Sequence, residues 1–163
     1  MTGIKMTRQS ISNPAIFMKS EALNYIKNIK NIQQFDEISR IKKHRNQDLN
    51  NLFHNISNNI SQYIDCAFKI NNYSFYCKIS FMPDCGGAQD NQYKDIEDFL
   101  HHSRDCNEKN TIFLAICDGD YYLKKDSQTG DATKLDKLKS LTHNKTSFVL
   151  SIEELELFLE KFI

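Results

Sequence analysis

The chain has 163 residues, of which 40% are hydrophobic, and it carries 21 basic and 21 acidic residues. This length suits one domain whose core folds without the support of disulfides or a metal ion. The longest apolar run, residues 111–117, is far shorter than the ~20 residues of a membrane helix, and residues 1–8 contain no apolar signal sequence. We therefore expect a soluble, cytoplasmic protein with no membrane partner.

The five cysteines exclude two common kinds of small scaffold. They lie at positions 66, 77, 85, 106 and 117, an odd number with no C-x-x-C pair. This spacing indicates neither a closed disulfide framework nor a zinc ribbon. We expect reduced and mostly buried thiols.

The balanced total charge conceals an asymmetry between two parts of the chain. Residues 1–62 carry 9 basic and 4 acidic side chains, whereas residues 63–163 carry 12 and 17. The basic segment at residues 40–45 is suited to contact the phosphates of a nucleic acid, but a solvated helix end is the more frequent meaning of such a segment. Charge alone does not decide between these interpretations.

The first third of the chain predicts an N-terminal tail and two helices. Residues 1–18 show no periodicity and are expected to form the tail, followed by a single α/β domain over residues 19–163. A helical pattern begins at Lys19. A clearer one covers residues 49–60, where apolar residues recur at i, i+3, i+4, i+7 and i+11.

A β-hairpin is predicted next. Residues 63–70 and 73–82 both alternate between apolar and polar side chains, and the two asparagines between them suit a two-residue turn. This turn places Asp65 opposite Lys78 on one face of the sheet. The other, apolar face is then formed by Ile64, Cys66, Phe68, Ile70, Phe75, Cys77, Ile79 and Phe81.

The second half alternates between helices and strands. The strand at residues 111–117 is apolar on both faces, as expected of a central strand covered by helices on each side. The last helix is expected to start with a capping box formed by Ser151 and Glu154. The other predicted elements are helices at residues 90–103 and 133–141 and a strand at residues 146–150. This order predicts a three-layer αβα domain with a mixed sheet flanked by helices.

An aspartate opposite a lysine on a hairpin is a familiar arrangement for phosphodiester hydrolysis. A carboxylate such as Asp65 can hold a divalent metal that activates water, while an ammonium such as Lys78 stabilises the developing negative charge. An ordinary cross-strand ion pair is the more frequent meaning of such a pair. The surrounding residues are therefore needed to distinguish a catalytic pair from an ordinary ion pair.

Three neighbouring segments resemble the core of type II restriction endonucleases in the PD-(D/E)xK superfamily. They are the strand ending at Lys78, the Gly-Gly-Ala-Gln-Asp-Asn turn at residues 86–91, and the Asp-Gly-Asp-Tyr sequence at residues 118–121. The resemblance covers roughly residues 45–125, about half of the chain, and includes the predicted αββαβ order.

The resemblance implies a restriction-endonuclease-like fold and Mg²⁺-dependent hydrolysis of double-stranded DNA within a restriction-modification system. Asp65 is then a metal ligand, Lys78 the catalytic ammonium, and the carbonyl of Cys77 a second metal ligand. A homodimer is compatible with this interpretation.

The chain departs from the family at one position. The second acid of the family falls two residues before Lys78, where this chain has Tyr76. A phenol, with a reference pKa near 10, is a poor ligand for Mg²⁺. Asp48 or Asp84 would have to replace the missing carboxylate.

We therefore expect an enzyme that is weak or inactive. One alternative is a non-catalytic protein that keeps the nuclease fold and binds nucleic acid or another partner. Another is an unrelated α/β domain in which the Asp65–Lys78 pair is only structural.

Overall fold

The computed structural model describes eleven helices and strands of the chain. They are α1 (Pro14–Lys27), β1 (Gln33–Glu37), β2 (Cys66–Ile70), β3 (Tyr73–Phe81), α5 (Gln89–Ser103), β4 (Thr111–Asp118), η2 (Asp120–Leu123), α6 (Lys134–Ser140), β5 (Ser147–Leu150), α7 (Ile152–Leu159) and η3 (Glu160–Phe162). The described residues are 14–37, 63–83, 89–106, 108–125, 130, 132–142 and 145–163. The helix predicted over residues 49–60 and the basic segment at residues 40–45 lie outside them.

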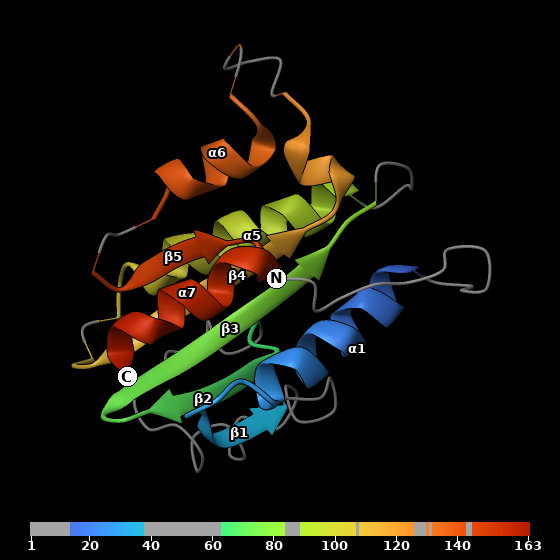
Figure 1. Ribbon diagram of the computed structural model, residues 1–163. Helices are drawn as coiled ribbons and strands as arrows, with labels where there is room; N and C mark the ends of the chain where they lie inside the picture. The colour runs from blue at the N-terminus through green and yellow to red at the C-terminus, as the bar shows by residue number, and fades with distance from the viewer. Residues whose placement is uncertain are drawn as a thin grey trace.

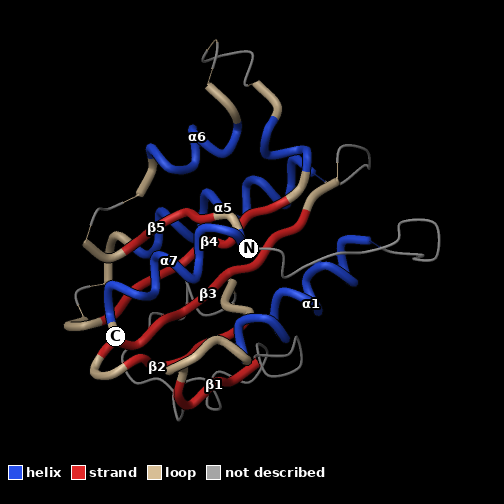
Figure 2. Tube along the Cα trace, viewed as in Figure 1, coloured by secondary structure: helices blue, strands red, loops and turns tan. Residues whose placement is uncertain are grey.

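The five strands form one mixed sheet in the order β1-β2-β3-β4-β5. The β1–β2 and β2–β3 pairs are antiparallel, whereas β3, β4 and β5 are parallel to one another. Helices α1 and α7 lie on one face of the sheet and α5 on the other (Figure 1). The strands lie between these helices in the tube view (Figure 2). The predicted α/β class, a mixed sheet with helices on both faces, is confirmed.

Two apolar cores separate the helices from the sheet. Residues 111–117 of β4 are all buried, because alternate side chains of this central strand enter opposite cores. The core beneath α1 and α7 includes Leu23, Ile26, Phe68, Phe75, Leu114, Ile116, Leu155 and Phe158. The core beneath α5 and α6 includes Tyr76, Tyr93, Ile96, Phe99, Leu100, Phe113, Ala115 and Leu138.

The predicted hairpin and its register are confirmed along β2. Ala67 pairs with Tyr76 and Cys66 with Cys77, and Asn71 in the turn has a positive φ of 52°. At the start of β2, however, the N–H of Asp65 donates to the carbonyl of Cys77 at 2.7 Å. Two residues, Asp65 and Cys66, therefore lie opposite Cys77, as in a β-bulge.

The bulge changes which face the preceding residue reaches. Ile64 was expected to share the face of Cys66, but it is buried in the core beneath α5. That expectation is wrong because one inserted residue shifts the alternation of every residue before it. The other residues of the predicted apolar face that belong to the core beneath α1 are Cys66, Phe68, Ile70, Phe75, Cys77 and Ile79.

Two elements at the start of the described chain differ from the sequence analysis. Helix α1 begins at Pro14, within the expected tail, and proline suits the first turn because its missing N–H would have no helical partner there. Strand β1 was not predicted. Its sequence, Gln-Gln-Phe-Asp-Glu, has no apolar alternation, and it pairs only with the edge of β2 through an irregular register.

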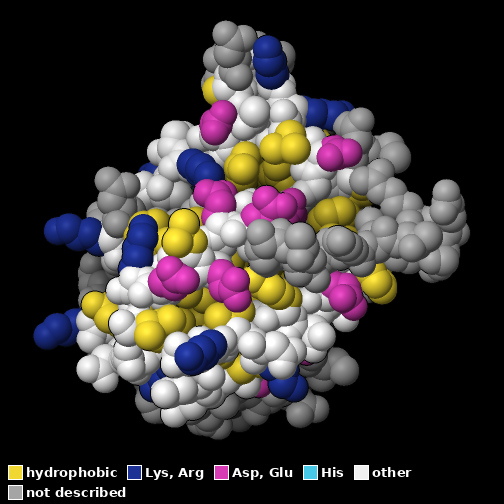
Figure 3. Space-filling view, viewed as in Figure 1, with side chains coloured by type: hydrophobic (Ala, Val, Ile, Leu, Met, Phe, Trp, Pro, Cys, Tyr) yellow, Lys and Arg dark blue, Asp and Glu magenta, His cyan; other side chains and the backbone are white. Residues whose placement is uncertain are grey.

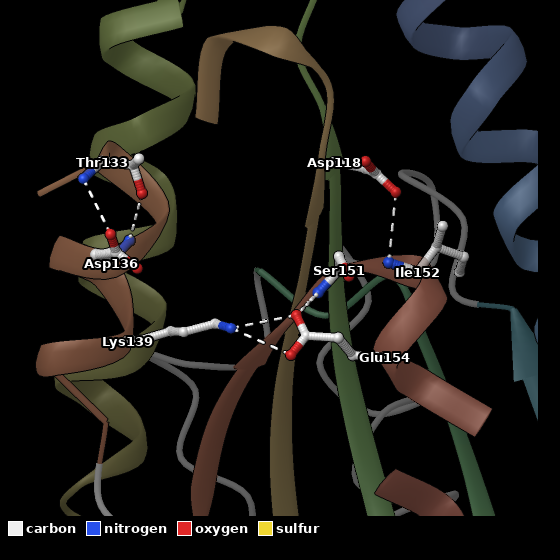
Figure 4. A network of polar contacts seen from close by, with 7 residues as sticks. All are labelled: Asp118, Thr133, Asp136, Lys139, Ser151, Ile152 and Glu154. Atoms are coloured by element: carbon white, nitrogen blue, oxygen red, sulfur yellow. Dashed lines mark hydrogen bonds and ion pairs between the residues drawn. The ribbon is translucent and has the colours of Figure 1, made fainter. Parts of the chain in front are cut away.

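Capping boxes fix the starts of α6 and α7. The hydroxyl of Thr133 accepts from the N–H of Asp136 at 3.1 Å, and Asp136 accepts from the N–H of Thr133 at 3.1 Å (Figure 4). The predicted capping box of Ser151 and Glu154 is confirmed. Glu154 also accepts from Lys139 of α6 at 3.2 Å, so these two helices are linked by an ion pair.

Gly119 connects β4 to η2 through a backbone conformation that other residues avoid. Its φ of 108° and ψ of 160° lie in a region that is essentially restricted to glycine. A Cβ atom at this position would collide with the carbonyl group of Met82. The N–H of Met82 in turn donates to the carbonyl of Asp118 at 2.9 Å, so β3 and β4 remain in contact at their carboxyl ends.

We predict that Gly119→Ala lowers the free energy of unfolding by at least about 3 kcal/mol, because backbone strain and the collision with Met82 add to each other. Gly130→Ala is the matched control: its φ is 78°, but no atom of the described residues lies within 4 Å of the added Cβ. It should lose only about 1 kcal/mol. Urea unfolding followed by circular dichroism measures both, and equal losses would contradict the packing argument.

Candidate functional site

The carboxylate of Asp65 is the most deeply buried charge of the predicted site. The residue is 3% exposed. Its Oδ1 lies 2.7 Å from the Nζ of Lys19. Its Oδ2 accepts from the N–H of Ile79 at 2.8 Å and lies 4.0 Å from the Nζ of Lys78. Both carboxylate oxygens are therefore engaged by donors from α1 and β3.

The point where β2 begins, at Cys66, explains this geometry. The regular ladder between β2 and β3 stops at the pair Cys66–Cys77, while β3 continues to Phe81. Beyond that point the N–H of Ile79 has no backbone partner in β2, and the side chain of Asp65 accepts its hydrogen bond instead. A carboxylate that receives a backbone N–H and an ammonium can remain buried, because these donors replace its lost hydration.

A pocket of about 190 Å³ lies beside the end of β3. It is lined by Lys19, Lys78, Ile79, Ser80, Phe81, Gln92 and Asp95. Its walls thus come from α1, β3 and α5, at the carboxyl ends of the parallel strands, where α/β sheets commonly bind ligands. The volume is below the ~300 Å³ of typical small-molecule sites, so it suits a group of a few atoms, such as one phosphate.

The predicted catalytic pair comes together beside this pocket. Asp65 and Lys78 approach to 4.0 Å, but the bulge sets Asp65 opposite Cys77, so the prediction that it lies directly opposite Lys78 is wrong. The carbonyl of Cys77, the second predicted metal ligand, accepts the N–H of Asp65, and the Cys77 side chain is buried beneath α1. Asp48, the third, and Asp84 lie outside the described residues.

Lys19 is a member of the site that the sequence analysis missed. It lies on α1 one turn before Ala22 and Leu23, which are buried against the sheet, so its position belongs to the inner face of the helix. A lysine within the apolar stripe of a helix is the sequence signal that could have identified Lys19 as a member of the site. Its partner, Asp65, is distant in sequence and is reached only by packing α1 onto the sheet.

Tyr76 is a core residue and not part of the pocket. It is 4% exposed, and its ring stacks on Phe113 with a centroid distance of 5.5 Å. Burial raises the pKa of its phenol well above the usual value, so the side chain is neutral. The position that corresponds to the family's second acid therefore supplies no charge to a metal.

The donors that the described residues offer at this pocket do not fit Mg²⁺. This ion takes an octahedral shell of carboxylates, water and substrate oxygens. No three His, Cys, Asp or Glu side chains among the described residues are placed to hold a metal ion. The single buried carboxylate near the pocket, Asp65, is already engaged at both oxygens, by an ammonium at Oδ1 and a backbone N–H at Oδ2.

Polar groups next to the site serve the fold. The hydroxyl of Tyr122 donates to Ser80 at 2.6 Å inside the protein. Burial raises the pKa of the Cys117 thiol to about 12, so this cysteine is not a thiolate nucleophile. Asp118 accepts from the N–H groups of Gly119 and of Ile152, at the start of α7, and burial raises its pKa (Figure 4).

No family model, curated protein or solved structure matches this chain. The resemblance to restriction endonucleases stays a prediction carried by its own residues. Among the described residues, no helix has both the length and the apolar character needed to span a membrane. The function is therefore argued from the pocket at Asp65.

We predict that Asp65→Asn lowers the free energy of unfolding by about 2 kcal/mol. Asparagine can still accept from Ile79, but it removes the counter-charge of Lys19 and Lys78. The loss stays below the ~3–5 kcal/mol of a fully buried pair because the side chain of Lys19 is 37% exposed. Lys139→Gln, which removes an exposed ion pair, should cost less than about 1 kcal/mol in the same urea titration. Equal losses would show that Asp65 is held no more tightly than a surface carboxylate.

The position of Tyr76 leads to another prediction. Tyr76→Phe should change the free energy of unfolding by no more than about 1 kcal/mol, because the ring and its stacking on Phe113 are kept. Tyr76→Glu should cost more than about 3 kcal/mol, since it places a carboxylate among apolar side chains. A calorimetric titration of Tyr76→Glu with Mn²⁺ gives a second readout, and we expect no gain in metal affinity. A stable Tyr76→Glu protein that binds Mn²⁺ would contradict the assignment of Tyr76 to the core.

Proposed function

We propose that this protein has a restriction-endonuclease-like fold and binds double-stranded DNA, with one backbone phosphate at the pocket of Asp65, and hydrolyses it feebly or not at all. The observation that carries this proposal is the pair of ammonium groups, Lys19 and Lys78, held by one buried carboxylate at the rim of a small pocket.

The chemistry of the two lysines supports a phosphate ligand. Ammonium groups bind phosphate oxygens as point charges through three rotatable donors. The side chain of Lys78 is only 16% exposed, so its charge is screened less than that of a fully exposed surface lysine. The pocket has the size of one phosphate group and lies at the carboxyl end of β3.

The charges on the surface around the site determine how much electrostatic attraction contributes to DNA binding. On the face that carries α1 and α7, basic side chains are separated from one another and acidic ones gather near the middle (Figure 3). The described residues therefore offer a local phosphate contact and no continuous basic stripe on this face. Two lysines predict a slope of about −2 for the logarithm of the binding constant against the logarithm of the salt concentration. The segment at residues 40–45 would make it steeper.

An active Mg²⁺-dependent nuclease is the second candidate function. The 4.0 Å approach of Lys78 to Asp65 favours it, because that is the pair such an enzyme uses. The engagement of both Asp65 oxygens argues against it. Incubation of supercoiled plasmid with the protein and Mg²⁺ separates the two candidates, and we expect little or no nicking. Strong cleavage that is lost in both Asp65→Asn and Asp48→Ala would establish the nuclease and identify Asp48 as a ligand.

The binding proposal predicts a specific effect of Lys78. Lys78→Gln should weaken binding to a fluorescent duplex about tenfold at low salt and reduce the salt slope by about 1, as the loss of one phosphate contact does. Lys109→Gln is the control, since Lys109 is an exposed lysine before the amino end of β4, at the opposite end of the sheet. It should leave both quantities unchanged in fluorescence anisotropy titrations.

Two outcomes would contradict the binding proposal. One is the absence of any salt-dependent binding by the unaltered chain. The other is an equal effect of Lys78→Gln and Lys109→Gln, because the contact would then not involve the pocket. Either result would favour an unrelated α/β domain in which Asp65 and Lys78 only stabilise the fold.

A further inference from the structure

The ammonium of Lys19 lies where a cation bound to Asp65 would lie. It is 2.7 Å from Oδ1, the carboxylate oxygen not used by the N–H of Ile79. We propose that Lys19 determines which ions the pocket accepts: it occupies the cation position on Asp65, excludes divalent cations, and makes the pocket selective for an anionic phosphate group. This inference rests on the proposed function for the identity of the phosphate ligand.

The fold holds Lys19 in this position. Three residues that follow it on α1, Ala22, Leu23 and Ile26, are buried against the sheet, so the helix backbone beneath the lysine is fixed. Only the freedom of the lysine side chain is then lost when the ammonium contacts Asp65. A divalent ion that approaches Oδ1 has to displace a charge that the fold itself keeps next to this carboxylate, at a high effective concentration.

The charge balance of the pocket depends on this lysine. The charged side chains of the pocket and its floor are Lys19 and Lys78 on one side and Asp65 and Asp95 on the other. With both lysines the formal charges cancel, so a phosphate meets two ammonium groups without a net negative field. Without Lys19 the same groups carry one net negative charge, which attracts cations and repels phosphate.

Lys19→Gln tests the proposal with Mn²⁺ as the only ligand. We expect this variant to bind Mn²⁺ at least about tenfold more tightly than the unaltered chain, in calorimetry and in the loss of the free Mn²⁺ signal in electron paramagnetic resonance. Mn²⁺ should also raise the melting temperature of Lys19→Gln while leaving that of the unaltered chain in place, because a ligand stabilises the state that binds it.

Matched variants separate the charge of Lys19 from other effects. Lys27→Gln removes an exposed lysine from the same helix and should behave like the unaltered chain. Lys19→Arg keeps the charge and should continue to exclude Mn²⁺. The double variant Lys19→Gln/Asp65→Asn should lose the Mn²⁺ binding that Lys19→Gln gains. Lys19→Met, which keeps the apolar stem, replaces Lys19→Gln if circular dichroism shows that the glutamine variant is unfolded.

Several results would overturn the proposal. Equal Mn²⁺ affinity of the unaltered chain and the folded Lys19→Gln or Lys19→Met variant would show that Lys19 excludes no cation. Retention of Mn²⁺ binding in the double variant would place the ion away from Asp65. These titrations contain no DNA, so a failure of DNA binding would refute the proposed function while leaving the exclusion of cations by Lys19 intact.

Discussion

The buried carboxylate of Asp65 is the constraint on which the arrangement of this site depends. Strand β2 begins one residue after Asp65, while β3 continues past that point, and the carboxylate takes the hydrogen bond of Ile79 that a longer β2 would have taken. The same carboxylate receives Lys19 and thereby joins α1 to the end of the sheet. Without these donors, burial of its charge would cost several kcal/mol (~3–5 when one partner of a buried pair is removed).

The parts of the fold that sequence patterns could predict are those in which local chemistry and tertiary packing agree. The alternation of β2 and β3 and the turn at Asn71 fix the hairpin, because a slip by one residue would turn every apolar side chain to the wrong face. Strand β1 escapes such reasoning, since it is polar and forms only because the edge of β2 offers backbone partners. The bulge at Asp65 also escapes it, because an inserted residue leaves the apolar pattern unchanged on either side.

The candidate site shows the same division. The proximity of Asp65 and Lys78 follows from strand pairing and was predictable, whereas the contact with Lys19 joins segments that only tertiary packing brings together. Tyr76 illustrates the opposite error. Tyr76 lies two residues before Lys78, so both side chains belong to the same face of β3 and Tyr76 was expected to border the pocket. It is instead buried beneath α5, where the strand is covered on both faces. Spacing along a strand identifies the face of the sheet on which a side chain lies, but not how deeply the side chain is buried.

Two independent features limit the negative charge at the pocket. Tyr76 is a neutral side chain of the core and contributes no carboxylate to the pocket, and Lys19 neutralises the carboxylate of Asp65. Either feature alone would weaken the binding of a divalent cation, because such an ion needs negative ligands to offset the loss of its tightly held water. Together they leave Lys78 beside a carboxylate whose charge is already balanced. An ammonium in that position attracts a further anion, which supports our proposal that the pocket holds a phosphate and does not activate water for its hydrolysis.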